Sequence, residues 1–236
     1  MSVHTFVSLM LLALACTGSA GCSLMTTRKD GDVAAFVRNE DRQVRKYVKN
    51  WEEVKQQNVV MQDHEYTCGA ASLATLMQHY FGDDVTEKQI LNVIEKQMPQ
   101  EEWVEKFTTG LSVRDLMRAA RSGEFGYEAE ARELKLSDLV ELTAPVIVHL
   151  EKNDFQHFVV YRGIADDRVY LADPILGNVR MSVDEFRQQW TGIAMALSKE
   201  GVDPGDDHAL AVDKKRASQP ELQTARRGIH LRPTRP

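Results

Sequence analysis

The chain has 236 residues, of which 43% are hydrophobic and 27% are charged, and its formal net charge at pH 7 is −6. This length and composition predict one well-cored globular domain with extensions. The acidic balance argues against a nucleic-acid partner, because proteins of that class carry an excess of basic residues.

The first 21 residues are predicted to be a signal peptide. Phe6 to Ala15 form an apolar run that is too short to span a membrane but has the length of a signal-peptide core. The small residues that follow end at Cys22 in "SAGC", which resembles a lipoprotein signal, although Ser19 stands where leucine is usual and "MSVHT" lacks a basic residue. We therefore expect a periplasmic protein anchored to the membrane by a lipid on Cys22. A cut at Cys16, or an ordinary signal peptide, is the alternative.

Residues 22–55 are predicted to form a charged, partly helical spacer. Apolar side chains recur there at helical spacing, at Val44, Tyr47, Val48, Trp51 and Val54. A solvated helical spacer is the simplest interpretation, and a tether or docking arm stays open.

Residues 56–197 show the pattern of a compact α+β domain. A short strand is predicted at 58–62, followed by helices at 68–81, from 86, from 112, at 135–142 and, after the strands, from 182. Strands of an antiparallel sheet are predicted at 145–150, 157–163, 168–173 and 178–181. This order indicates N-terminal helices packed on a C-terminal antiparallel sheet. The tail, residues 198–236, has no apolar period and is predicted to be disordered.

Cys68 is the candidate nucleophile. If Cys16 is removed and Cys22 carries a lipid, Cys68 is the only thiol of the mature chain, and it cannot form an intramolecular disulfide. Such a thiol is exposed to oxidation in an exported protein unless it is buried or in use. Cys68 precedes Gly69 at a predicted helix start, where unpaired N–H groups stabilise a thiolate. The alternative is a small, inert core residue.

A thiolate nucleophile needs an imidazole partner that later protonates the leaving amine. Of the histidines that follow Cys22, His157 is the best candidate, because it opens a strand at the end of a loop, where a side chain is both accessible and held. The remaining candidates are His64, His79, His149, His208 and His230. Asp173 ends the next predicted strand, so hairpin pairing would bring its carboxylate close enough to orient the imidazole of His157. Gln62, six residues before Cys68, could donate its amide N–H to an oxyanion together with the backbone N–H of Cys68.

These residues resemble the C39 branch of papain-like cysteine peptidases, the enzymes that remove Gly-Gly leader peptides from bacteriocin precursors. The shared motifs are a Gln six residues before Cys-Gly, then "HFVV", "DP" followed by Gly, "EF" and "WTG", which begin here at Gln62, Cys68, His157, Asp173, Glu185 and Trp190. The resemblance implies a papain-like fold over residues 56–197 and no cofactor. By the same resemblance Cys68 is the nucleophile, His157 the base, Asp173 the orienting acid and Gln62 the oxyanion donor.

The chain also departs from that family pattern. Thr67 stands before the cysteine where the family often has Asp, which leaves the substrate preference open. C39 domains commonly begin an ABC transporter, but no membrane-spanning run or Gly-x-x-x-x-Gly-Lys-Ser/Thr loop is found here. We therefore expect a stand-alone exported form, similar to the protease component of functional-amyloid secretion systems. Its expected partners are an exported polypeptide substrate and outer-membrane secretion machinery.

Three other functions stay open. A C39-like domain without catalysis would be a binding module that recognises or chaperones a secreted polypeptide. A related acyl transfer, such as transamidation or amide hydrolysis in peptidoglycan, would use the same residues with another acceptor. A metal site could combine Cys68 with His64, His157 or Asp173, but the Cys-x-x-Cys and His-x-x-x-His spacings typical of zinc ligands are missing.

Overall fold

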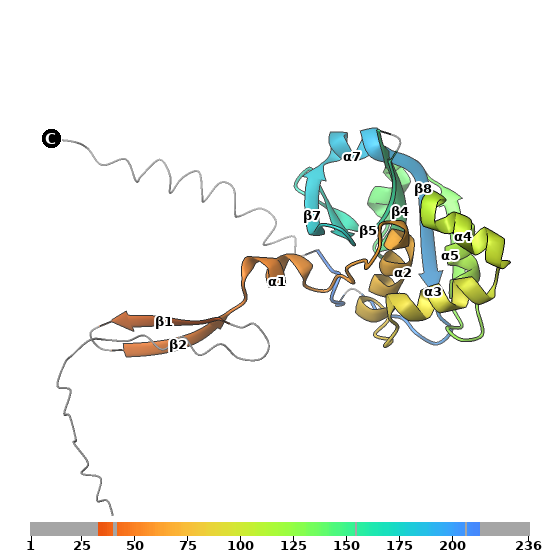
Figure 1. The fold of residues 1–236 in the computed structure, drawn as a ribbon. Helices are drawn as coiled ribbons and strands as arrows, with labels where there is room; N and C mark the ends of the chain where they lie inside the picture. Colours follow the sequence, from red (N-terminus) through yellow and green to blue (C-terminus); the bar gives the residue numbers. More distant parts are fainter. Residues whose placement is uncertain (1–32, 40–41, 154, 206, 213–236) are drawn as a thin grey trace, which may run out of the picture. The chain divides into compact units, whose positions relative to one another are not determined.

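The structure is a computed structural model that describes residues 33–39, 42–153, 155–205 and 207–212, with only the backbone described for 33–48. The predicted signal peptide, Cys22 and residues 213–236 of the predicted tail lie outside the described residues. The chain divides into two units, Met1–Asn50 and Trp51–Pro236, and each is described by itself (Figure 1).

The first unit contains a β-hairpin where the sequence predicted a helix. Strands β1 (Val33–Asn39) and β2 (Arg42–Val48) pair antiparallel, from Val33 opposite Val48 to Asn39 opposite Arg42. The helical prediction for residues 44–48 is therefore wrong. Valine and tyrosine favour strands, and a helical spacing followed over only two turns does not outweigh that preference. The helical part of the predicted spacer is α1 (Trp51–Gln56).

The second unit is an α+β domain, as predicted. After α1, its helices are η1 (Glu65–Thr67, a 3-10 turn), α2 (Cys68–His79), α3 (Glu87–Lys96), α4 (Gln100–Thr109), α5 (Val113–Ala120), α6 (Leu136–Glu141) and α7 (Val183–Gln189). Its strands are β3 (Glu128–Glu133), β4 (Val146–Lys152), β5 (Phe155–Ala165), β6 (Arg168–Asp173), β7 (Gly177–Ser182) and β8 (Trp190–Ser198). The strands form one antiparallel sheet in the order β3-β8-β4-β5-β6-β7.

Side-chain caps fix three of the predicted helix starts. Thr86 and Ser112 each form a capping box, with Gln89 and Asp115 respectively, and Ser182 accepts a hydrogen bond from the backbone N–H of Glu185. Each cap satisfies N–H groups that have no partner within the helix. The predicted beginnings of α3, α5 and α7 are therefore confirmed.

Three elements of the domain were not predicted, and one predicted strand is not formed. Helix α4 and strands β3 and β8 were not predicted; β3 reads "EAEARE", whose charges are typical of an exposed edge strand rather than of a buried one. Residues 58–62 form no strand. The backbone N–H of Val60 instead binds Thr75 Oγ1 at 3.0 Å, and that of Gln62 binds the Pro174 carbonyl at 2.9 Å.

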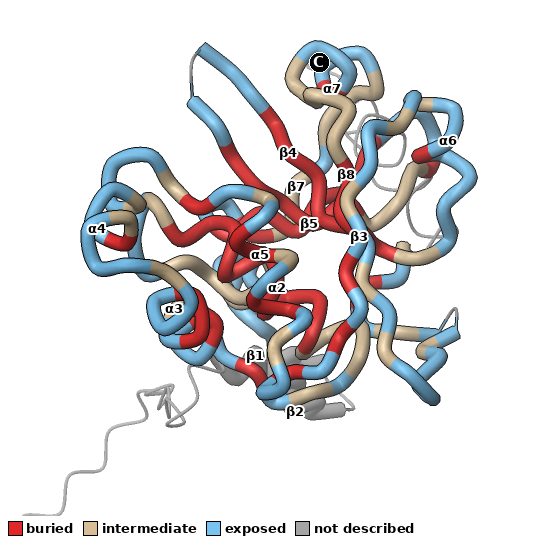
Figure 2. Tube along the Cα trace, turned by 90° about the vertical axis from the view of Figure 1, so that its right-hand side faces the viewer, coloured by how far each residue is buried: buried red, intermediate tan, exposed pale blue. Residues whose placement is uncertain are grey.

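Helix α2 is the centre of the core (Figure 2). Its residues 68–77 are all buried, and Ser72 Oγ donates to the Phe158 carbonyl of β5 at 3.0 Å. Side chains of β5 alternate between two apolar clusters. Phe158 and Val160 belong to the cluster of α2, whereas Val159 and Tyr161 pack on the opposite face with Phe186 of α7. The middle of β5 is thus buried on both faces and holds the start of the strand in place.

Residues 209–211 pack on the domain, so for this part of the predicted tail the prediction of disorder is wrong. Leu210 is fully buried in the α2 cluster. Arg162 of β5 donates from Nε to the Leu210 carbonyl at 2.8 Å and from Nη2 to the Ala211 carbonyl at 3.2 Å. Asn58 Nδ2 donates to the Ala209 carbonyl at 3.0 Å. A single buried leucine and backbone carbonyls leave no periodic signal in the sequence.

Candidate active site

Cys68 is the first residue of α2 and a free thiol that is 7% exposed. Gly69 follows it for a steric reason. A Cβ atom at this position would lie 2.9 Å from Leu116 Cδ1 and 3.3 Å from Phe158 Cδ2, closer than packed atoms tolerate. Glycine therefore lets the N-terminus of α2, and with it the thiol, approach α5 and β5.

His157 and Asp173 meet across the β5–β6 hairpin, as the sequence predicted. The strands pair antiparallel with Val160 opposite Ala172, which places Asp173 beside the start of β5. The Nε2 of His157 lies 3.1 Å from Asp173 Oδ1, and both side chains are almost fully buried. His157 Nδ1 is buried and has no hydrogen-bond partner among the described residues. Because Nε2 binds the carboxylate, Nδ1 is the ring nitrogen left for Cys68.

The electrostatics of the site favour a charged imidazole. Burial by itself lowers the pKa of His157, but its contacts with Asp173 and with the Cys68 thiol outweigh burial and raise the pKa to about 9. Burial opposes ionisation of Asp173, yet its hydrogen bond to His157, the charge of that residue and two backbone amides lower its pKa. The structure therefore brings Cys68, His157 and Asp173 together as an interacting set.

The turn after β6 holds the Asp173 carboxylate. The backbone N–H groups of Ile175 and Leu176 donate to Asp173 Oδ1 at 2.7 and 3.0 Å. Gly177 closes the turn with φ at +78°, and a Cβ there would lie 2.4 Å from the Lys55 carbonyl oxygen. Only glycine fits this conformation and this close approach. The "DPILG" motif thus forms a turn whose backbone N–H groups hold the Asp173 carboxylate in place.

Gln62 lies beside this turn, and the structure shows no contact between its side chain and Cys68. Its backbone N–H binds the Pro174 carbonyl, its Nε2 donates to the His64 carbonyl at 2.8 Å, and its Oε1 is buried without a partner. One amide hydrogen of Nε2 is therefore engaged and the other is available.

Glu87, at the start of α3, supports the loop between Gln62 and Cys68. It was not among the site residues predicted from the sequence. Its buried carboxylate accepts from the backbone N–H of Asp63 at 3.2 and 3.4 Å. Burial raises the pKa of Glu87, while bonds to Thr67 and Asp63 oppose that rise. In the sequence Glu87 looks like an ordinary acidic residue after the Thr86 cap, so no local signal marks it.

His149, on β4, was another candidate for the base, and its ring is held by contacts outside the Cys68–His157–Asp173 set. The Nδ1 of His149 lies 3.1 Å from Thr191 Oγ1, and its ring packs on Phe158 at 4.8 Å between centroids. The pKa of His149 is lowered, mainly by burial. His79 is at the C-terminal end of α2, far along the helix from Cys68, and His64 is exposed and stacks on Tyr66.

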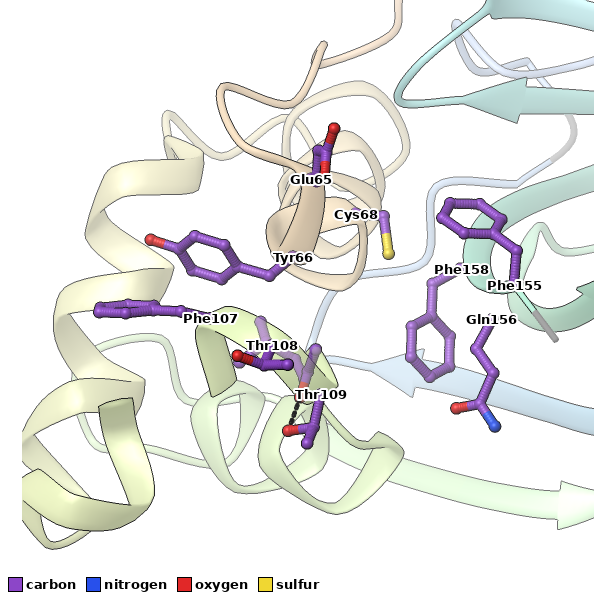
Figure 3. Close-up of a pocket in the computed structure, with 11 residues that line it drawn as sticks. Glu65, Tyr66, Cys68, Phe107, Thr108, Thr109, Phe155, Gln156 and Phe158 are labelled. Atoms are coloured by element: carbon purple, nitrogen blue, oxygen red, sulfur yellow. Dashed lines mark hydrogen bonds between the residues drawn. The ribbon is translucent and has the colours of Figure 1, made fainter. Parts of the chain in front are cut away.

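A pocket of about 350 Å³ opens next to the thiol, and we call it the Cys68 pocket (Figure 3). The Cys68 side chain points toward Phe155 and Phe158 of β5, and the rings of Tyr66 and Phe107 lie on the other side of η1. That these four aromatic side chains line one pocket was not predicted, because they come from three separate elements, η1, α4 and β5. An extended chain entering here would pass the thiol.

No group of three or more His, Cys, Asp or Glu side chains in the described part could hold a metal ion. None of the helices there is long and apolar enough to cross a membrane.

The sequence model of the Peptidase C39 family matches residues 56–201. The chain is 34% identical over 146 residues to "Probable functional amyloid protease FapD" of Pseudomonas fluorescens, and the match covers 62% of each protein, less than two thirds of that relative. It is 31% identical over 163 residues to the FapD of Pseudomonas aeruginosa, covering 69% of this chain and 70% of the relative.

Among solved structures, the peptidase domain of Streptococcus ComA, a bi-functional ABC transporter involved in quorum sensing, superposes with a TM-score of 0.51 at 25% identity. This match covers 61% of the present chain and 99% of the ComA domain. The fold expected from the sequence, a papain-like C39 domain, is confirmed. Since the family match extends over more than half of its length, this chain belongs to the peptidase C39 family.

Proposed function

We propose that the protein is an exported cysteine endopeptidase that cleaves a secreted polypeptide by attack of the Cys68 thiolate on a peptide carbonyl. The observation that carries the proposal is the position of His157, which binds Asp173 through Nε2 and leaves its buried Nδ1 for the thiol. A pKa raised to about 9 keeps the imidazole charged near neutral pH, as a thiolate–imidazolium pair requires.

In the resting ion pair the proton of the Cys68 thiol is already on His157 Nδ1, and in the first step the thiolate sulfur attacks the carbonyl carbon of the substrate. The carbonyl oxygen becomes an oxyanion. The backbone N–H of Cys68, at the N-terminus of α2, and the free amide hydrogen of Gln62 Nε2 are the donors that stabilise it.

In the second step, His157 Nδ1 returns its proton to the leaving nitrogen as the C–N bond breaks, which leaves a thioester on Cys68. A water molecule then attacks this thioester, with His157 again as the base, and the free thiol is restored. Asp173 keeps the imidazole in the tautomer and orientation that both proton transfers need.

The substrate we propose is an exported polypeptide, either a leader-bearing precursor or a component of an amyloid system. The support is the name of the two Pseudomonas relatives, functional amyloid proteases, together with the signal-peptide pattern before Cys22. In this proposal the enzyme acts in the periplasm, is held at the membrane by a lipid on Cys22 and works beside outer-membrane secretion machinery.

The test is cleavage of candidate exported polypeptides by the purified protein, with the products identified by mass spectrometry. The wild-type protein should cut at or just after a Gly-rich site, and Cys68→Ala should abolish cleavage without changing the fold. In the producing cell, Cys68→Ala should also block processing. If this variant supports secretion as well as the wild type, the protein is a binding module and the proposal is wrong.

A further inference from the structure

Three large apolar side chains surround the His157–Asp173 pair and are exposed. Phe155, at the start of β5, is 51% exposed, and Ile175 and Leu176, in the turn after β6, are 43% and 51% exposed. Single exposed apolar residues are common, but three of them next to one buried ion pair form a patch that calls for an explanation.

A second pocket of about 350 Å³ lies beneath this patch, and we call it the His157 pocket. Besides the three exposed residues, its walls include His157, Asp173, Leu150, Val179 and Met181. The strand register puts these walls on one face of the sheet, because Leu150 pairs with His157 and Val179 pairs with Leu171. Leu150 and Leu171 belong to the cluster of α7, so the inner wall of the pocket lies on the α7 side of the sheet.

The two pockets divide the catalytic residues between them. Cys68 lines the first pocket, His157 and Asp173 line the second, and Phe155 lines both. A third pocket, of about 590 Å³, contains Gln62 and shares Phe155 and Ile175 with its neighbours. The three pockets therefore adjoin one another along the catalytic residues and are not separate surface features.

The chemistry assigns each half of a substrate to one side of this series. The residues before the cleaved bond end as a thioester on Cys68. The residue after the bond carries the nitrogen that takes its proton from His157, so this half lies on the imidazole side. We propose that the His157 pocket binds an apolar side chain of the substrate, at the first or second residue after the cleaved bond. This inference rests on the proposed function and adds a specificity for the released half.

The lining of the pocket selects for aliphatic or aromatic side chains. Leu150, Val179 and Met181 provide an apolar wall, and the pocket is also bordered by the charged or polar residues Lys152, Arg180, Glu185 and Gln189. The volume is at the lower end of ligand sites, which is enough for one large side chain. A small polar or acidic side chain would leave the apolar wall in contact with water. It would also lose its own hydration on entering the pocket.

The test is a panel of peptides that share the sequence before the cleaved bond and carry Leu, Phe, Ser or Asp at the first or second position after it. Wild-type protein should cleave the Leu and Phe peptides with kcat/KM at least ~10-fold above the Ser and Asp peptides at one of the two positions. Equal kcat/KM across the panel at both positions overturns the inference.

The variant Leu176→Ser tests whether the preference for apolar side chains arises in the His157 pocket. The matched control is Val140→Ser, because Val140, on α6, is also 51% exposed. Leu176→Ser should reduce the preference for Leu over Ser, mainly through KM, and Val140→Ser should leave it unchanged. A preference that survives in Leu176→Ser overturns the assignment to this pocket. If Leu176→Ser lowers the melting temperature far more than the control, Leu176→Met replaces it, and this variant should retain the preference for Leu.

A binding experiment separates this inference from the proposed function. Cys68→Ala protein should bind the fluorescently labelled Leu peptide more tightly than the Ser peptide, whether or not the wild type cleaves either one. If no peptide is cleaved but the Leu peptide binds more tightly, the pocket assignment stands and the proposed reaction fails. If both peptides bind equally to Cys68→Ala, the pocket assignment fails.

Discussion

At the scale of single residues, the site depends on which nitrogen of His157 is engaged. Asp173 binds Nε2, and its own carboxylate is held by the amides of Ile175 and Leu176, so the imidazole is oriented by a hydrogen bond to an acceptor that is itself fixed. The proximity of His157 and Asp173 could be predicted from the sequence, because a hairpin of two consecutive strands is a local pattern, whereas Cys68 was assigned to them by its position at a helix start and by the family resemblance. The sequence could not predict the orientation of Gln62, which depends on the distant Pro174 and on His64.

Gln62→Ala should lower kcat by roughly 100-fold or more, the scale expected when one oxyanion donor is removed. The melting temperature should hardly change, because the backbone bond of Gln62 to Pro174 remains. Steady-state kinetics and thermal denaturation check this prediction, with the exposed Gln57→Ala as the control. A kcat close to that of the wild type would mean that another group stabilises the oxyanion.

The pH dependence of kcat/KM should show an upper limit near pH 9, because the leaving amine needs a charged His157 and the pKa of His157 is raised to about 9. The raised pKa also stabilises the fold: this contribution is complete below the ordinary value of 6.5 and is lost as the pH rises through about 9. Asp173→Asn should move the upper limit to lower pH and reduce kcat only in part. An upper limit that stays in place in Asp173→Asn would contradict the role given to this carboxylate.

At the scale of elements, hydrogen bonds from side chains to distant backbone carbonyls hold the site together. Asn178 of β7 donates from Nδ2 to the carbonyls of Lys55 and Gln57, so the turn after Asp173 is tied to the segment that leads to Gln62. Arg162, whose Nη1 also binds Asn178 Oδ1, extends the same network to residues 210 and 211. Such contacts are invisible in the sequence, because they join asparagine and arginine to carbonyls more than 45 positions away.

Leu210→Ala should destabilise the domain by about 2–5 kcal/mol, the usual cost of removing a fully buried leucine side chain. The exposed Val202→Ala, from the same segment, should cost far less. Urea denaturation followed by tryptophan fluorescence measures both variants. Equal stability of the two would show that residues 199–212 do not contribute to the core.

At the scale of the whole molecule, the domain was more predictable than its extensions. The capped helices and the β-branched strands of residues 56–197 follow strong local rules, and the α+β order determined the fold class. Residues 44–48, which lie in β2, were predicted to be helical, because two valines and a tyrosine fit both the helical and the strand period. Strand β3 was missed because an edge strand carries charge in place of apolar residues.

The lipid anchor belongs to the proposed function and can be tested on the whole protein. Intact-mass analysis of the membrane fraction should show a chain that begins at Cys22 and carries a diacylglyceryl-type addition. The Cys22→Ser variant should appear in the soluble periplasmic fraction. A wild-type chain that begins elsewhere, without added mass, would contradict lipidation and leave export open.

The central claim is that His157, oriented by Asp173, activates Cys68, and the rate of Cys68 alkylation by iodoacetamide as a function of pH tests it most directly. Peptide mapping by mass spectrometry follows Cys68 alone. At pH 6 the wild-type thiol should react at least ~10-fold faster than the thiol of His157→Gln, because an imidazolium partner maintains the thiolate in acid. The two rates should converge above about pH 9, where His157 loses its charge. Equal rates at pH 6 would contradict the account, because Cys68 would then react independently of the imidazole.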